Sequence, residues 1–108
     1  MKATYWQRGE ALDYKNDTTS TIEENTVVEI KTRIGVTGNA IEPGQTGSLH
    51  VCGIFALPKA ESEAIEMGSL VYSTGDGVTT QADGNVPAGY AAKASTAEET
   101  EVLVKLLG

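Results

Sequence analysis

The chain has 108 residues, of which 15 are acidic and 8 basic, so its formal net charge is −7. A single domain most often contains about 100–150 residues. Because there is no Lys/Arg cluster to neutralise phosphates, we expect neither nucleic acid nor an anionic membrane surface to be a partner. No apolar run approaches the roughly 20 residues of a membrane-spanning helix, and the N-terminus lacks the apolar stretch of a signal peptide.

The first predicted elements are short and extended. Thr4–Trp6 and Ala11–Tyr14 are two extended candidates, and a polar stretch at residues 16–21 reads as a loop. We therefore expect residues 1–20 to form an N-terminal arm or edge strands, and residues 21–108 to form the main domain.

The two strongest strand patterns follow. Apolar and polar side chains alternate along Thr26–Ile34, as a half-buried strand requires. Pro43-Gly44 is typical of a type II turn, because proline presets the first central position and glycine accepts a positive φ at the second. Both faces of Ser48–Leu57 are apolar, which predicts one central strand covered on both sides.

The next segment predicts the only helix. Residues 59–67 carry good helix formers with acids in the first turn, Pro58 suits the first helical position, and Gly68 suits the end. The residues expected to face the sheet are Ala60, Ala64 and Met67.

Four further strands are expected at Leu70–Tyr72, Val78–Thr80, Val86–Lys93 and Glu101–Leu107, the first two as a hairpin. Short strands at intervals of about 8–12 residues, with Gly, Pro and Asn turns between them, indicate a small sandwich or barrel. The predicted fold class is therefore all-β, with one short α-helix near residues 59–67.

Few residues could carry chemistry. A single Cys and a single His exclude an internal disulfide and a multi-His metal site, so we expect no metal, no cofactor and no catalytic residue. His50 and Cys52 share a face of one predicted strand, the spacing of a Cys–His nucleophile pair, but their apolar surroundings and the lack of a third orienting residue favour a packed Cys and a hydrogen-bonded His. Among the acidic residues Glu61, Glu63 and Glu66, the last two could share a divalent cation on a helix, but a solvated helix face is favoured because no further ligand is near in the sequence.

Three of the six aromatic residues lie in the first 14 positions. Aromatic and Arg side chains dominate interface hot spots, so this segment is either a partner-binding arm or is packed on its own domain. The residues predicted to bind a partner are Thr4, Tyr5, Trp6, Arg8 and Tyr14.

An ordered series of short segments resembles the capsid cement, or head-decoration, proteins of tailed phages. The segments are residues 24–28 (ENTVV), 34–36 (IGV), 41–47 (IEPGQTG), 51–59 (VCGIFALPK), 68–72 (GSLVY), 86–91 (VPAGYA) and 102–106 (VLVKL), with ATY at 3–5 and LDY at 12–14. The chain departs from the family pattern at Ser69, where an acid is common, and at Cys52, where Glu is common.

This resemblance implies a β-tulip type of sandwich that assembles as a homotrimer. It further implies a non-enzymatic virion protein that is assembled in the host cytoplasm and binds the capsid exterior. Its partner would be the major capsid protein, whose neighbouring subunits it would cement against internal DNA pressure. Two alternatives remain open: a carbohydrate- or host-surface-binding module using Tyr72 and Tyr90, and a small hydrolase using His50 and Cys52.

Overall fold

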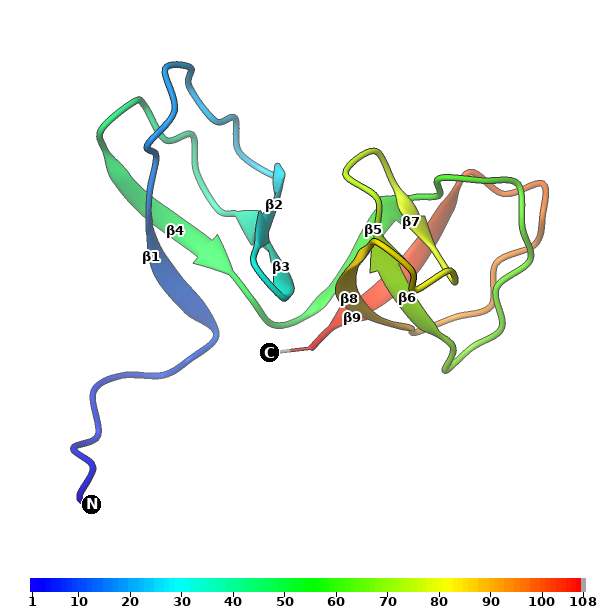
Figure 1. Ribbon diagram of the computed structural model, residues 1–108, viewed down its shortest axis with the longest axis horizontal. Helices are drawn as coiled ribbons and strands as arrows, with labels where there is room; N and C mark the ends of the chain where they lie inside the picture. Colours follow the sequence, from blue (N-terminus) through cyan, green and yellow to red (C-terminus); the bar gives the residue numbers. More distant parts are fainter. Residues whose placement is uncertain (108) are drawn as a thin grey trace.

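The computed structural model describes residues 1–107, which form two antiparallel β-sheets and contain no helix (Figure 1). The all-β class predicted from the sequence is confirmed. The strands are β1 (Ala11–Lys15), β2 (Val27–Ile30), β3 (Arg33–Thr37), β4 (Thr46–His50), β5 (Ile54–Pro58), β6 (Leu70–Ser73), β7 (Val78–Thr79), β8 (Val86–Ala91) and β9 (Glu101–Leu106).

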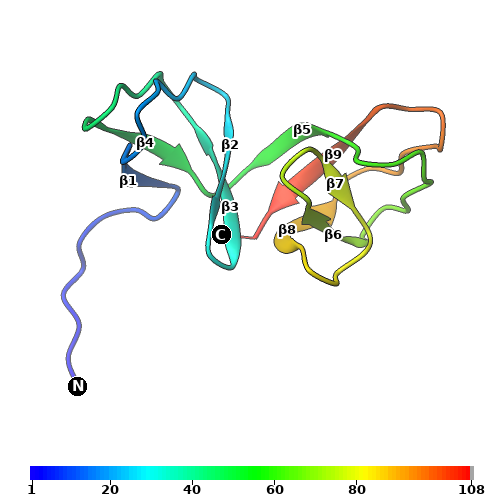
Figure 2. The same cartoon turned by 45° about the horizontal axis from the view of Figure 1, so that its top comes forward.

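The chain builds one sheet and then the other. Strands β1 to β4 form a four-stranded sheet in the order β1-β4-β3-β2, and β5 to β9 form a five-stranded sheet in the order β5-β9-β8-β6-β7. Figures 1 and 2 show the two sheets side by side, joined by the short link between β4 and β5. Strands β1 and β2 are the outer strands of the first sheet, so β1 carries the N-terminal segment at an edge.

The hydrophobic core lies where the sheets meet. On β9 every second residue is buried, and these inward residues pack with Ile34 and Val36 of β3. The buried core residues are Ile34, Val36, Leu57, Ile65, Val71, Val78, Ala88, Ala91, Val102, Val104 and Leu106. Burying a Val, Leu or Ile side chain contributes roughly 1.5–3 kcal/mol, so this shared core is what holds the two sheets together.

The strand predicted at Thr26–Ile34 is wrong, because the structure divides it into the hairpin β2–β3. Ile30 pairs with Arg33, and the two residues between them make the turn, with Lys31 at a φ of 60°. Two-residue hairpin turns are usually recognised in a sequence by Asn-Gly or Asp-Gly. A Lys-Thr turn carries no such signal, so the alternating pattern predicted one continuous strand across the turn.

The single central strand predicted at Ser48–Leu57 is also wrong. The chain leaves β4 at His50, turns at Gly53, whose φ is 116°, and enters β5 in the other sheet. Strand β5 is an edge strand that pairs only with β9. Both faces read as apolar because the segment serves two different sheets, and not because one strand is covered twice.

The helix predicted near residues 59–67 is absent, and the segment is irregular. Some of its backbone N–H groups donate to distant segments, Ala60 to the carbonyl of Val78 and Ile65 to that of Ser95, and Glu63 donates to the carbonyl of Glu61 instead of within a helix. Ile65 enters the core while Met67 is 73% exposed, the reverse of the predicted apolar face. A helix of two to three turns is marginal by itself, so these tertiary contacts override the local propensity.

Other local predictions are confirmed. The amide of Gln45 donates to the carbonyl of Glu42, and Gly44 has a φ of 79°, as the type II turn at Pro43-Gly44 requires. The hairpin of β6 and β7 is present, as are β1, β8 and β9. The extended candidate Thr4–Trp6 belongs to neither sheet.

Candidate functional site

The N-terminal arm, defined here as residues 1–8, has no regular secondary structure and runs away from both sheets (Figures 1 and 2). Tyr5 is 81% exposed and Trp6 is 87% exposed. Thr4 and Arg8 are exposed on the same segment. Aromatic side chains of this size are normally buried in a core or an interface, so the arm presents contact surface that the chain itself does not use.

The arm is attached to the four-stranded sheet through residues 10 and 11. The carbonyl of Glu10 accepts a 3.0 Å hydrogen bond from the amide of Val51, and β1 then pairs with β4 from Ala11 onward. Tyr14 lies on β1, half-buried, opposite Gly47. The structure therefore places four of the five predicted partner-binding residues on the arm and Tyr14 on the adjoining strand.

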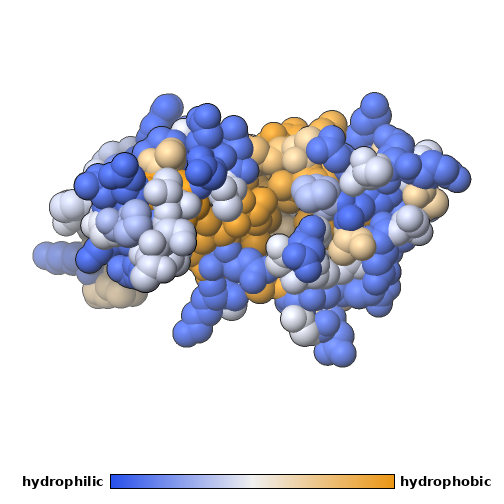
Figure 3. Space-filling model, turned by 90° about the horizontal axis from the view of Figure 1, so that it is seen from above, coloured by the Kyte–Doolittle hydropathy of each residue, from blue (hydrophilic) through white to orange (hydrophobic). Residues whose placement is uncertain are grey.

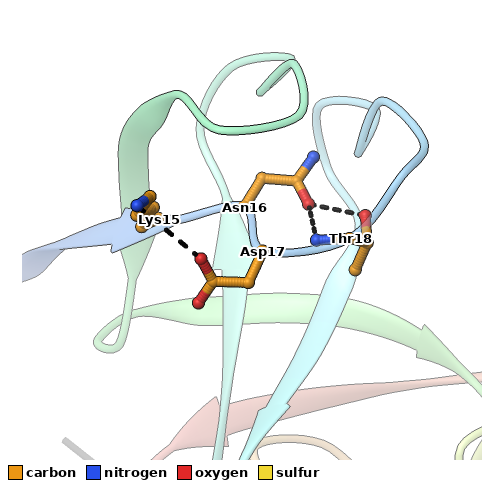
Figure 4. A network of polar contacts seen from close by, with 4 residues as sticks. All are labelled: Lys15, Asn16, Asp17 and Thr18. Carbon is orange, nitrogen blue, oxygen red and sulfur yellow. Dashed lines mark hydrogen bonds and ion pairs between the residues drawn. The ribbon is translucent and has the colours of Figure 1, made fainter.

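Asn16 fixes the chain directly after β1, and sequence reasoning missed it. Its side chain is fully buried: Nδ2 donates to the carbonyls of Ser20 and Ile41, each at 2.8 Å, and Oδ1 accepts from the amide and the hydroxyl of Thr18. Figure 4 shows these contacts to Thr18 beside the exposed ion pair of Lys15 and Asp17. Asn before Ser/Thr residues favours such local turns, which is the signal that was available.

An open cleft of about 320 Å³ lies between the two sheets. Its walls come from the start of β2, the end of β5 and the turn between β6 and β7. Figure 3, which looks down from the top of Figure 1, shows apolar surface gathered in this middle region between more hydrophilic ends. Sequence reasoning missed the cleft because its walls are far apart in the chain. The apolar residues of the wall are Val27, Leu57, Pro58 and Val78.

His50 and Cys52, which the sequence allowed to be considered as a Cys–His pair, do not share a strand. His50 is exposed at the end of β4, with its ring centroid 6.5 Å from that of Phe55, and Cys52 is exposed in the link to β5. The alternative of a packed Cys is wrong as well, since Cys52 is on the surface. Within residues 1–107, no group of three or more His, Cys, Asp or Glu side chains is arranged to hold a metal ion.

The acidic residues of the irregular segment have separate roles. Burial raises the pKa of the Glu63 carboxyl, but hydrogen bonds from the amide and hydroxyl of Thr80 and from the hydroxyl of Thr79 outweigh it and leave the pKa below its usual 4.5. Glu61 and Glu66 are exposed. The Glu63 carboxylate thus fastens its segment to β7 and the residue that follows.

The two tyrosines considered for a carbohydrate module lie on the outer face of the five-stranded sheet. Both are half-buried, and the ammonium of Lys105 sits 5.8 Å from the centre of the Tyr90 ring. A sugar would need an uncovered aromatic face on which to stack, and Lys105 occupies one side of Tyr90.

In the part of the chain that the structure describes, no helix has the length and hydropathy to cross a membrane. No curated protein and no solved structure matches the chain significantly. A family model described as phage cement protein matches residues 6–106, which include Trp6, Arg8 and every strand. This family has a structural role in the virion, which argues against an enzyme. The chain therefore belongs to the phage cement protein family, as the resemblance of its sequence segments indicated.

Proposed function

We propose that this protein binds the outer surface of an expanded phage capsid and cements neighbouring major capsid subunits against the pressure of packaged DNA. The family match over residues 6–106 is the observation that carries the proposal. The exposed aromatic arm adds to it, because a cement protein needs a surface that stays unused until it meets the shell.

The contact segment in this proposal is residues 1–20, comprising the arm and β1, and residues 21–108 form the decoration domain. The predicted contact residues are Thr4, Tyr5, Trp6, Arg8 and Tyr14. Lys2 and Arg8 are the only charged side chains in residues 1–9, so all 15 acidic residues lie in the remainder of the chain. The arm is thus a basic, aromatic segment, and its charge suits it to an acidic patch on the shell.

Cementing in this way requires binding and no chemistry. A protein that binds only the expanded shell stabilises that state by mass action, by about 2.7 kcal/mol per site when its free concentration is 100 times its Kd. As a homotrimer it would engage three sites at once, and linkage raises the effective concentration for each further contact to roughly millimolar. Assembly on the capsid in the host cytoplasm would place the protein on the virion exterior.

The test is binding to expanded, DNA-filled particles that lack the protein, measured by co-sedimentation. Replacing Tyr5 and Trp6 by Ala removes two hot-spot side chains, so we expect the affinity to fall at least about tenfold, with the unfolding temperature unchanged. Met67→Ala is the matched control, because Met67 is also large, apolar and exposed but lies in the five-stranded half. Full binding by the arm variant would refute the arm as the contact, and no saturable binding by the wild type would refute the cement function itself.

A further inference from the structure

The outer face of the five-stranded sheet is unusually apolar for a surface. Ile54 is 57% exposed, Leu70 is 55% exposed and Leu103 is 40% exposed. Side chains of directly paired residues in antiparallel strands point to the same face, so the pairs Ile54–Lys105, Ala56–Leu103 and Leu70–Tyr90 place these residues on one surface. Exposed apolar groups gathered on one face, rather than scattered singly, indicate an interaction surface.

Charges on this face have a specific arrangement. The exposed residues of β9 are Glu101, Leu103 and Lys105, because the intervening residues are buried in the core. Glu101 and Lys105 therefore stand on either side of Leu103, each about 7 Å away along the strand, and carry opposite charges. Such a row is complementary to its own copy when the second copy runs in the opposite direction.

We propose that this face binds the same face of a second copy of the chain. The twofold axis lies between the two faces, perpendicular to β9, and passes over Leu103. The axis stacks Leu103 on Leu103 and brings Lys105 of each copy opposite Glu101 of the other. Because Ile54 pairs with Lys105 and Pro58 with Glu101, the same rotation sets Ile54 opposite Pro58 of the second copy. Every contact occurs twice, as in any isologous interface.

Other features of the face suit a paired sheet. The Tyr90 ring lies 5.8 Å from the Lys105 ammonium, which helps to hold this side chain at the surface in position for a partner. Two sheets that pack face to face lie about 10 Å apart, a separation that Leu, Ile and Lys side chains can span. The arm leaves from the other sheet, so this contact does not depend on capsid binding, and it doubles whatever assembly the remaining surfaces form.

Charge reversal tests this inference sharply. Glu101→Lys leaves two lysines in the row and Lys105→Glu leaves two glutamates, so either variant repels its own copy. In an equal mixture of the two variants, every like-charge contact becomes an attraction. We expect wild-type protein to sediment at twice the mass of either variant alone. We expect the equal mixture of the two variants to regain this doubled mass.

Glu42→Lys and Lys31→Glu are the matched controls, since both residues are exposed in the four-stranded half, and we expect them to leave the doubled mass unchanged. Restoration in the mixture also shows that both variant chains fold. The inference is overturned if wild type and variants have the same mass, or if the mixture does not recover the doubled mass. No capsid is present in this experiment, so its failure would leave the cement function standing.

Discussion

The carboxylate of Glu29 accepts a 2.9 Å hydrogen bond from the hydroxyl of Ser73, which joins β2 of the four-stranded sheet to β6 of the five-stranded sheet. The Ser73 side chain is buried, and its oxygen also accepts a 3.2 Å bond from the amide of Gly75. Ser73 and Gly75 both line the cleft between the sheets. This bond therefore adds a polar link between the two sheets, beside the hydrophobic core that they share.

The first prediction follows from this bond. Ser73→Ala removes one hydrogen bond between the sheets and one within the turn, and should lower the free energy of unfolding by about 1–2 kcal/mol in urea titrations. Ser62→Ala, at an exposed position, should change it by less than about 0.5 kcal/mol. In a double-mutant cycle with Glu29→Ala, which removes the acceptor, purely additive effects would show that the bond contributes nothing.

Asn16→Ala should be more damaging. The change removes all four side-chain hydrogen bonds and leaves the buried Ile41 carbonyl without its Asn16 donor, so we expect a loss of about 2–3 kcal/mol in unfolding free energy. Asn85→Ala is the control, because Asn85 makes one exposed bond to the carbonyl of Gln81 and its loss should cost well under about 1 kcal/mol. Equal losses in the two variants would contradict the role assigned to Asn16.

Gly89→Ala should disrupt the pairing of β8 with β9. A Cβ atom at Gly89 would lie 2.0 Å from the carbonyl oxygen of Lys105, a backbone atom that cannot move aside without breaking the sheet. We expect a loss of about 3 kcal/mol or more, or failure to fold. Gly9→Ala, where a Cβ would meet nothing within 4 Å, should leave the thermal unfolding temperature unchanged. An unfolding temperature for Gly89→Ala equal to that of wild type would show that the two strands do not approach this closely.

Acid should weaken the attachment of the irregular segment. Because the pKa of Glu63 is lowered on folding, its charged form stabilises the fold above the unfolded pKa of about 4.5, and this contribution is lost as the pH falls through the folded pKa. Unfolding temperatures measured between about pH 6 and pH 3 should therefore fall less steeply for Glu63→Gln than for wild type.

The control for this experiment is Glu61→Gln, an exposed neighbour in the same segment. It should keep the pH profile of the wild type. If Glu63→Gln kept that profile as well, the hydrogen bonds to Thr79 and Thr80 would not be the source of the effect.

Local pattern predicted the strands that remain within one sheet. Val102, Val104 and Leu106 alternate with polar or exposed residues along β9, and the structure buries these three residues. The same pattern failed at Lys31, where the hairpin turns without glycine, and at Gly53, where the chain changes sheets. It failed again at Ile65, because a core contact distant in sequence overrides helix propensity.

The sequence also singled out the N-terminal segment, because three of the six aromatic residues lie in its first 14 positions, but it left open whether this segment is an extended arm or is packed on the domain. It did not locate Asn16, whose partners include the Ile41 carbonyl 25 residues away, or the cleft, whose walls meet only after both sheets form. The alternating pattern of the sequence already places Glu101, Leu103 and Lys105 on one face of a strand. Its meaning as an interface depended on seeing that Ile54 and Leu70 extend the same exposed surface.

The temperature at which DNA escapes from heads lacking this protein, measured with and without added purified protein, tests the central claim most directly. We predict saturable binding to expanded, DNA-filled heads and a higher release temperature at saturation, with no binding to unexpanded particles. Release at the same temperature despite saturation, or equal binding to expanded and unexpanded particles, would contradict the account.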